Sequence, residues 1–199
     1  MKKWMIPVFA AGGVAVVGTA VLGGILLFGN RHGMKSPEEV VLNAVQAQII
    51  DGDFEELCML GRYPMIKAVC DLEATDRQTL QCVDEAKGYW DETMQNSMEY
   101  LGEIQDYSVV NIELIPVDDE ETELTKGSYE RVGDQVDNVV DVECEMNISY
   151  SMYAGDHQYM TVRAIEIDDR WYLDVLESAI PQYLMSAYNN LLETGQLVG

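Results

Sequence analysis

Basic residues are scarce in this 199-residue chain, which has 12 Lys and Arg against 35 Asp and Glu. The formal net charge at pH 7 is -23, and no acidic residue precedes Glu38. A protein surface of this sign repels nucleic acid and anionic lipid surfaces, which excludes nucleic acid as a partner. The acidic part is not a disordered tail, because apolar residues are plentiful in it and recur periodically.

Motifs of several enzyme classes are also missing. The chain has no phosphate-binding Gly loop, no G-x-S-x-G, no H-E-x-x-H and no paired-Cys motif. His157 stands in a predicted hairpin turn, where a histidine is usually solvated. The acidic run at 118–123 lacks the alternating ligands and the Gly of an EF-hand loop. We therefore predict no catalytic residue, no metal site and no cofactor, and the residues of any ligand site stay unassigned.

Cysteine occurs four times, as Cys58, Cys70, Cys82 and Cys144. The regular spacing of the first three does not match the spacing of zinc ligands. An even count permits disulfides in an oxidising compartment, but the sequence alone does not fix their connectivity. Two alternatives stay open: buried thiols, or a disulfide within the helical half of the domain.

An uncharged run from Trp4 to Asn30 is the clearest feature that the sequence does have. At about 1.5 Å of rise per residue, a helix of this length crosses a hydrocarbon core of roughly 30 Å. We expect residues 4–30 to be a transmembrane anchor, with Trp4 and Phe28 inside it. A cleaved secretory signal is an alternative, although the run is long and does not end in a small-x-small site. A buried soluble helix is a second alternative.

The charges that flank the run bear on its orientation. Basic residues stand on both sides of it, so the count is nearly balanced. We favour a cytoplasmic flank over residues 1–3, because this segment is too short to be anything else. Residues 36–199 then form an acidic extracytoplasmic domain, and the chain is a single-pass protein of the cell membrane.

Helical patterns fill the first half of that domain. Ser36, Pro37 and Glu39 predict a helix start with a capping box. The longest helix is predicted over residues 76–104, with Thr75 as its cap and an apolar face that we expect to pack against a sheet. Shorter helices are expected over residues 54–60, 64–70 and 120–131.

After residue 106 the apolar residues begin to alternate with polar ones. Val110, Ile112 and Leu114 predict a first strand, and the strongest strand signal runs from Val140 to Met152. The next strand shifts its apolar parity near Ala164 and Ile165, which suggests a bulge across which Arg163 and Glu166 pair. The last expected elements are strands over 159–167 and 170–175 and a helix that opens at 178 and ends at 195.

The order of helices, a meander of long strands and a final helix predicts an α+β fold with an antiparallel sheet. With an early helix closing on Asp51-Gly52-Asp53-Phe54 and a strand that ends in Arg170-Trp171-Tyr172-Leu173, the chain resembles the nuclear transport factor two-like superfamily of cone-shaped domains. It looks most like the membrane-anchored or lipoprotein domains of unknown function of Gram-positive bacteria. The resemblance spans residues 36–175.

The resemblance implies a cone with an interior site, but the superfamily includes enzymes, binding domains and scaffolds. Its enzymes place Asp, Tyr or His inside the cone. Tyr150 lies on the apolar face of a predicted strand, where we expect a packed core residue, with a hydroxyl that projects into a pocket as the alternative. We expect a non-catalytic domain that binds a partner protein or a small ligand. The alternatives are an enzyme of the same fold with a buried Asp or Tyr, and a structural subunit of an envelope complex. The oligomeric state is not predicted.

Overall fold

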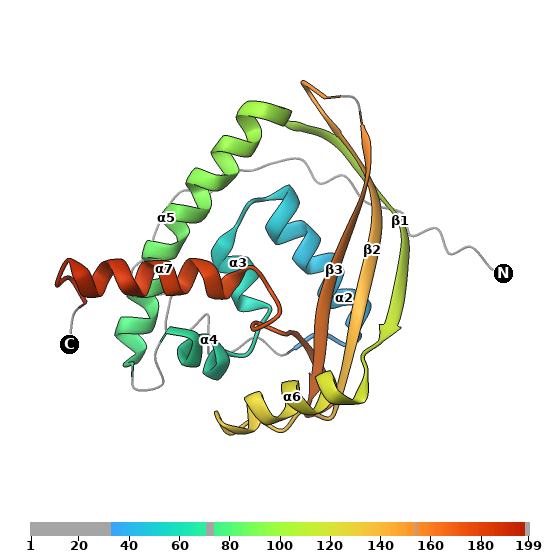
Figure 1. The fold of residues 1–199 in the computed structure, drawn as a ribbon. Helices are drawn as coiled ribbons and strands as arrows, with labels where there is room; N and C mark the ends of the chain where they lie inside the picture. Colours follow the sequence, from blue (N-terminus) through green and yellow to red (C-terminus); the bar gives the residue numbers. More distant parts are fainter. Residues whose placement is uncertain (1–32, 71–73, 154, 198–199) are drawn as a thin grey trace.

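A computed structural model describes residues 33–70, 74–153 and 155–197. The expected flank 1–3 and anchor 4–30 lie outside these residues. Within the described ranges, none of the helices combines the length and the apolar character that crossing a bilayer requires. The elements, drawn in Figure 1, are α2 (Pro37–Val45), the π-helical turn η1 (Gln46–Ile50), α3 (Phe54–Met59), α4 (Tyr63–Cys70), α5 (Asp76–Leu101), β1 (Ile104–Pro116), α6 (Asp119–Glu130), β2 (Asn138–Tyr150), β3 (Asp156–Ile167), β4 (Arg170–Leu173) and α7 (Ile180–Glu193).

The predicted α+β order is confirmed: helices come first, then an antiparallel sheet, then a final helix. The sheet has four strands in the order β1-β2-β3-β4, and each strand pairs antiparallel with the next. Helix α2 packs on the inner face of β2, β3 and β4. Helices α5 and α7 pack against each other away from the sheet, and α6 lies across its lower end (Figure 1).

Two predicted helix starts have different outcomes. Thr75 caps α5 in a complete capping box with Gln78, as expected of its hydroxyl at that position. The capping box predicted at Ser36 is wrong, because its side chain makes no capping hydrogen bond. Glu39 instead accepts a hydrogen bond of 2.9 Å from the backbone N–H of Lys35, one residue earlier.

The long helix α5 packs chiefly on other helices, so the prediction that its apolar face covers a sheet is wrong. Its contacts are with α7, α4 and α3. Cys82, Val83, Ala86 and Trp90 are its buried apolar residues. The periodicity identifies the buried face, but it holds no information on what covers that face.

The alternation of β2 is confirmed where the strand covers the core. Val142, Cys144, Met146 and Ile148 are all fully buried, and the residues between them face outward. Met152 departs from the prediction, because β2 ends at Tyr150 and Met152 lies beyond it with 64% of its surface exposed.

The bulge predicted in β3 is wrong. The pairing of β2 with β3 runs without a register shift from Asn138–Glu166 to Ile148–Asp156. Ala164 and Ile165 are both buried although neighbouring residues of a regular strand point to opposite faces, so both faces of β3 are covered here. In a regular strand, residues three apart point to opposite faces, so Arg163 and Glu166 do not pair.

The edge strand β1 holds the irregularities instead. Its register against β2 shifts between Ile104 and Asp106 and again between Val109 and Asn111. Val110 therefore falls at a bulge and is 50% exposed, outside the apolar face that the sequence predicts for it. Because β1 pairs with β2 alone, its outer edge is unpaired within the described part of the chain.

Candidate functional site

A large cleft opens between the second half of α5 and the upper end of the sheet. Its volume is about 1400 Å³, and its walls come from η1, α5, the start of β1, the end of β2 and the start of α7. In Figure 1, α5 and the sheet converge at the top, where α5 runs into β1, and the turn η1 lies between them. The volume exceeds that of a typical pocket for a small molecule, which is about 300–1,000 Å³.

Packed aromatic rings form one side of the cleft. Phe54, Trp90 and Tyr183 have ring centroids 5.1 to 5.8 Å apart, in tilted and edge-to-face arrangements. The indole N–H of Trp90 donates a hydrogen bond of 2.7 Å to the backbone carbonyl of Gly52. Trp90 and Tyr183 line the cleft, and the buried ring of Phe54 supports them from behind. The aromatic surface is therefore held in a fixed orientation.

Uncharged polar side chains supply much of the remaining lining. The π-helical turn η1 presents Gln46, which accepts a hydrogen bond of 3.0 Å from the Tyr107 hydroxyl and donates one of 2.9 Å to Asp51. π-helical turns are frequent at functional sites. Gln158 donates a hydrogen bond of 3.3 Å to the Tyr150 hydroxyl. The glutamines of the cleft are Gln46, Gln48, Gln105, Gln158 and Gln182.

The charge of the cleft is entirely negative. Asp51, Glu103 and Asp106 line it and are exposed, whereas no Lys, Arg or His is among the described residues of the lining. Met94 and Met98 add flexible apolar surface to the α5 wall. This combination suits a ligand that has an apolar body and carries a positive charge or none.

Two residues considered in the sequence lie in different places. Tyr150 lines the cleft and is half-buried, with its hydroxyl hydrogen-bonded to Gln158. His157 lies on the outer face of the sheet, with Nδ1 2.9 Å from Asn147 Oδ1 and Nε2 2.6 Å from a Glu145 carboxylate oxygen. Its neighbours are strand residues, and the cleft lies on the other face.

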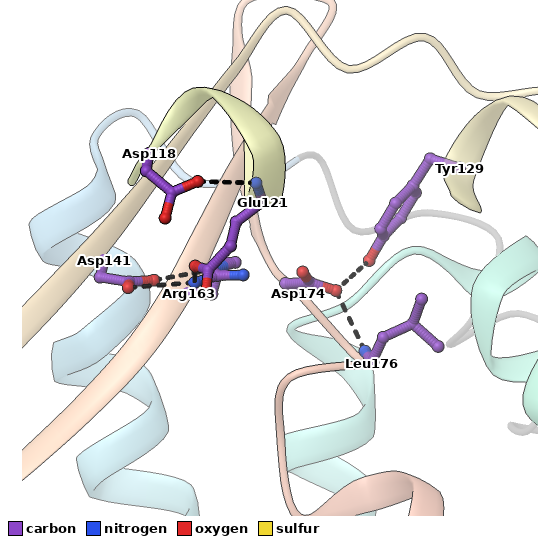
Figure 2. A network of polar contacts seen from close by, with 7 residues as sticks. All are labelled: Asp118, Glu121, Tyr129, Asp141, Arg163, Asp174 and Leu176. Atoms are coloured by element: carbon purple, nitrogen blue, oxygen red, sulfur yellow. Dashed lines mark hydrogen bonds and ion pairs between the residues drawn. The ribbon is translucent and has the colours of Figure 1, made fainter. Parts of the chain in front are cut away.

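The acidic run at 118–123 opens α6 and serves that helix. The Asp118 carboxylate accepts a hydrogen bond of 2.9 Å from the Glu121 backbone N–H and caps the helix (Figure 2). Among the described residues, no group of three or more His, Cys, Asp or Glu side chains is arranged to hold a metal ion.

Arg163 joins α6 to the sheet. Its guanidinium donates to both oxygens of Asp141 on β2, at 2.8 and 3.2 Å, and to Glu121 on α6 at 2.7 Å (Figure 2). The hydrogen bond to Asp141 is the main cause of the raised pKa of Arg163, and Glu121 adds to it. The Arg163 side chain is only 11% exposed, but Glu121 is 52% exposed and Asp141 25%, so the bonds to Asp141 are the better shielded from water.

A buried Asp–Tyr pair lies next to this network. The Tyr129 hydroxyl donates a hydrogen bond of 3.1 Å to Asp174, which also accepts one of 3.0 Å from the Leu176 backbone N–H (Figure 2). Burial raises the pKa of Asp174 and also that of Tyr129. Asp174 borders a smaller cavity of about 210 Å³ between α6 and the segment after β4, separate from the large cleft.

Sequence reasoning missed most of these residues. The glutamines of the cleft are scattered from Gln46 to Gln182 and belong to no motif. The partners of Arg163 are 22 and 42 residues away, and Tyr129 is 45 residues from Asp174. Comparisons with known protein families and with curated proteins find no match to this chain.

Proposed function

We propose that residues 36–199 form a non-catalytic binding domain whose large cleft holds an apolar ligand that is positively charged or neutral. The observation that carries this proposal is the lining of the 1400 Å³ cleft, which combines aromatic rings, methionines and glutamines with three carboxylates and no basic side chain. Preformed apolar concavities with a few polar groups are the usual form of a binding site.

A segment of a partner protein fits this surface better than a small molecule does. Exposed apolar side chains extend from Met98 in the cleft wall to the end of α5 and the segment after β2, and their exposed fractions are 53% for Met98, 84% for Tyr100, 64% for Met152 and 54% for Tyr153. Backbone hydrogen bonds hold the two segments together, including one of 3.2 Å from Met152 N–H to the Leu101 carbonyl. Exposed apolar surface of this kind is typical of protein-binding sites.

An anchor over residues 4–30 with an extracytoplasmic domain remains our proposal for the cellular setting, and so does membership of the nuclear transport factor two-like superfamily. The uncharged run supports the anchor, and the α+β order with an open cleft beside the sheet supports a cone-shaped domain. Function as a structural subunit of an envelope complex is compatible with the same surface.

Acid–base catalysis is the second candidate, and the buried Asp174–Tyr129 pair is the observation in its favour. Each of these two side chains is engaged with its neighbour and with backbone N–H groups, and the pair lies outside the large cleft. This arrangement supports a structural role for the pair, so we rank catalysis below binding.

Calorimetric titration of the full chain tests the binding proposal. The probes are two short peptides with the same aromatic and aliphatic residues, one with Lys and the other with Glu at its polar positions. We expect binding of the Lys peptide only, because three carboxylates line the cleft. Ser97→Trp, which places a bulky ring in the cleft, should weaken binding at least about tenfold, a change of about 1.4 kcal/mol.

Asn96→Trp is the matched control, because Asn96 is exposed on the same helix and does not line the cleft. Equal affinity for the two peptides would contradict the charge argument. Equal loss of binding in the two Trp variants would show that the peptide does not occupy the cleft.

A further inference from the structure

The smaller cavity lies between α6 and the segment that follows β4. Its volume is about 210 Å³, below the roughly 300–1,000 Å³ that is typical of pockets for small molecules. Its walls come from α6, from β3 and from the segment after β4, and it shares no lining residue with the large cleft. It is therefore a separate place in the fold, with room only for a small ligand.

The hydroxyl of Thr125 on α6 has no hydrogen-bond partner among the described residues, although Thr125 is only 7% exposed. In the described part of the chain, every fully buried side-chain nitrogen or oxygen atom does have a partner. The Thr125 hydroxyl must therefore be accessible from the cavity that Thr125 lines. A hydroxyl that is almost buried and unbonded is unfavourable, and a ligand in the cavity would supply the missing partner.

Asp174 presents a second unused group to the same cavity. Both hydrogen bonds that the structure gives it, from Tyr129 and Leu176, end on its Oδ1 atom (Figure 2). Its Oδ2 atom has no partner within the described ranges, and by the same reasoning this atom is accessible from the cavity. Because Asp174 is 1% exposed, Oδ2 is a carboxylate acceptor that is held largely out of water.

The carboxylates of the cavity outnumber its cation. Arg163, the one basic residue of the described lining, is bonded to Asp141 at 2.8 Å and to Glu121 at 2.7 Å. Asp174 and Glu177 form no ion pair with any described residue. Burial raises the pKa of Asp174 most, and the charge of Glu177 raises it further, so the two negative charges repel each other. A cation bound between them would relieve this repulsion.

We propose that this cavity binds a short linear diamine. One ammonium group donates hydrogen bonds to Asp174 Oδ2 and to the Thr125 hydroxyl, and the second stays at the rim next to Glu177, which is exposed. An ammonium group has three donors and no acceptor, which suits a site whose free groups accept hydrogen bonds. The exposed side chains of Leu124 and Leu176 also line the cavity, and they would contact the methylene chain between the two amines.

Other small ligands suit the cavity less well. An anion would be repelled by Asp174 and Glu177, and a neutral diol would leave their charges uncompensated. A metal ion lacks ligands, because no group of three or more His, Cys, Asp or Glu side chains in the described ranges is arranged to hold one. The proposal does not rest on the ligand of the large cleft, which has a different lining.

An NMR titration of the isotope-labelled full chain tests the proposal at physiological salt, which screens weak binding to the rest of the acidic surface. The probes are diaminobutane with an amine at each end, butylamine and butanediol. The backbone N–H of Leu176 donates to Asp174, so its amide signal reports occupation of the cavity. We expect the amide signals of Leu176 and Thr125 to shift to saturation with the diamine. Butylamine should bind more weakly, and butanediol should not bind.

Asp174→Asn and Thr125→Val should each weaken diamine binding at least about tenfold, because each removes an acceptor from a charged donor. Glu177→Gln, at an exposed position, should reduce the advantage of the diamine over butylamine. Glu130→Gln is the matched control, because Glu130 is exposed at the end of α6 and does not line the cavity. Equal affinities of Asp174→Asn and Glu130→Gln for the diamine, or shifts confined to the lining of the large cleft, would overturn the proposal.

Discussion

Among the carboxylates whose burial the structure describes, Asp174 is the most deeply buried. It is 1% exposed, and the Arg163 cation, whose charge lowers its pKa, is bonded to Asp141 and Glu121 instead. Burial raises its pKa, while the hydrogen bonds from Leu176 and Tyr129 lower it. Desolvation has the larger effect, so the folded state binds a proton at Asp174 more tightly than the unfolded chain does.

The substitution Asp174→Asn tests whether the pKa of Asp174 is raised in the folded state, through its effect on the free energy of unfolding. Because the folded pKa is raised, the stability that the protonated group contributes is present at low pH and is lost as the pH rises through the folded pKa. The variant should therefore gain stability relative to the wild type as the pH rises above about 4, by at most about 1.4 kcal/mol per pH unit. Urea unfolding across this range measures the difference.

Asp91→Asn is the control for that experiment, because Asp91 is exposed on α5. Asp91→Asn replaces the same carboxylate with the same amide, but at an exposed position. A difference between wild type and Asp174→Asn that does not vary with pH would show that Asp174 titrates alike in the folded and unfolded states.

The polar residues show most clearly what the sequence cannot predict. Strand alternation places Tyr150 on the apolar face of its strand, because the alternation assigns a face to each residue whatever its contacts are. Nearness in sequence pairs Arg163 with Glu166, whereas its bonds go to Asp141 and Glu121. Those bonds depend on the strand register and on the position of α6, which are tertiary properties.

The junction between α5 and β1 decides the shape of the cleft at the scale of elements. Gly102 ends α5 with φ of 79°, a conformation that residues with a side chain rarely adopt. A Cβ there would overlap Ser151 Oγ and lie 2.9 Å from the Met152 backbone nitrogen. Glycine at this position lets α5 turn into β1 while staying in contact with the end of β2.

Gly102→Ala should destabilise the fold by about 1–3 kcal/mol, because it adds backbone strain to a steric overlap. Gly88→Ala is the matched control on the same helix: a Cβ at residue 88 would have no neighbouring atom within 4 Å, and Ala is the better helix former. It should stabilise by about 0.5–1 kcal/mol. Denaturant unfolding measures the stability of both variants. If both substitutions changed the free energy of unfolding equally and in the same direction, Gly102 would have no special role at the junction.

Elements with one covered face are the predictable ones. β2 has a core face and an outward face, so its alternation identifies its buried residues. β3 is covered on both faces near Ala164 and Ile165. Two apolar residues therefore follow each other in the sequence, a break in the alternation that a bulge would also produce. The real bulges lie in β1, whose largely exposed residues give a weak pattern. The cleft itself arises from the divergence of α5 and the sheet, which no local pattern records.

At the scale of the whole molecule, the start of the described chain and the cleft lie at opposite ends of the sheet. Met34 pairs with Trp171, which pairs with Glu166 at one end of β3. Gln158, which lines the cleft, is eight residues back along that strand, about 26 Å away at 3.3 Å per residue. An anchor that precedes Gly33 would thus be attached at the end of the sheet away from the cleft.

Protease accessibility in intact cells tests the proposed topology, with the full chain expressed with a C-terminal epitope tag. The flanking positive charges are nearly balanced, so orientation depends on a small difference and has to be measured. We expect external protease to remove the tag while a cytoplasmic marker protein stays intact. A tag that resists protease until the cells are lysed would put the acidic domain in the cytoplasm. The cysteines would then stay reduced thiols there, and the partner of the cleft would be a cytoplasmic protein.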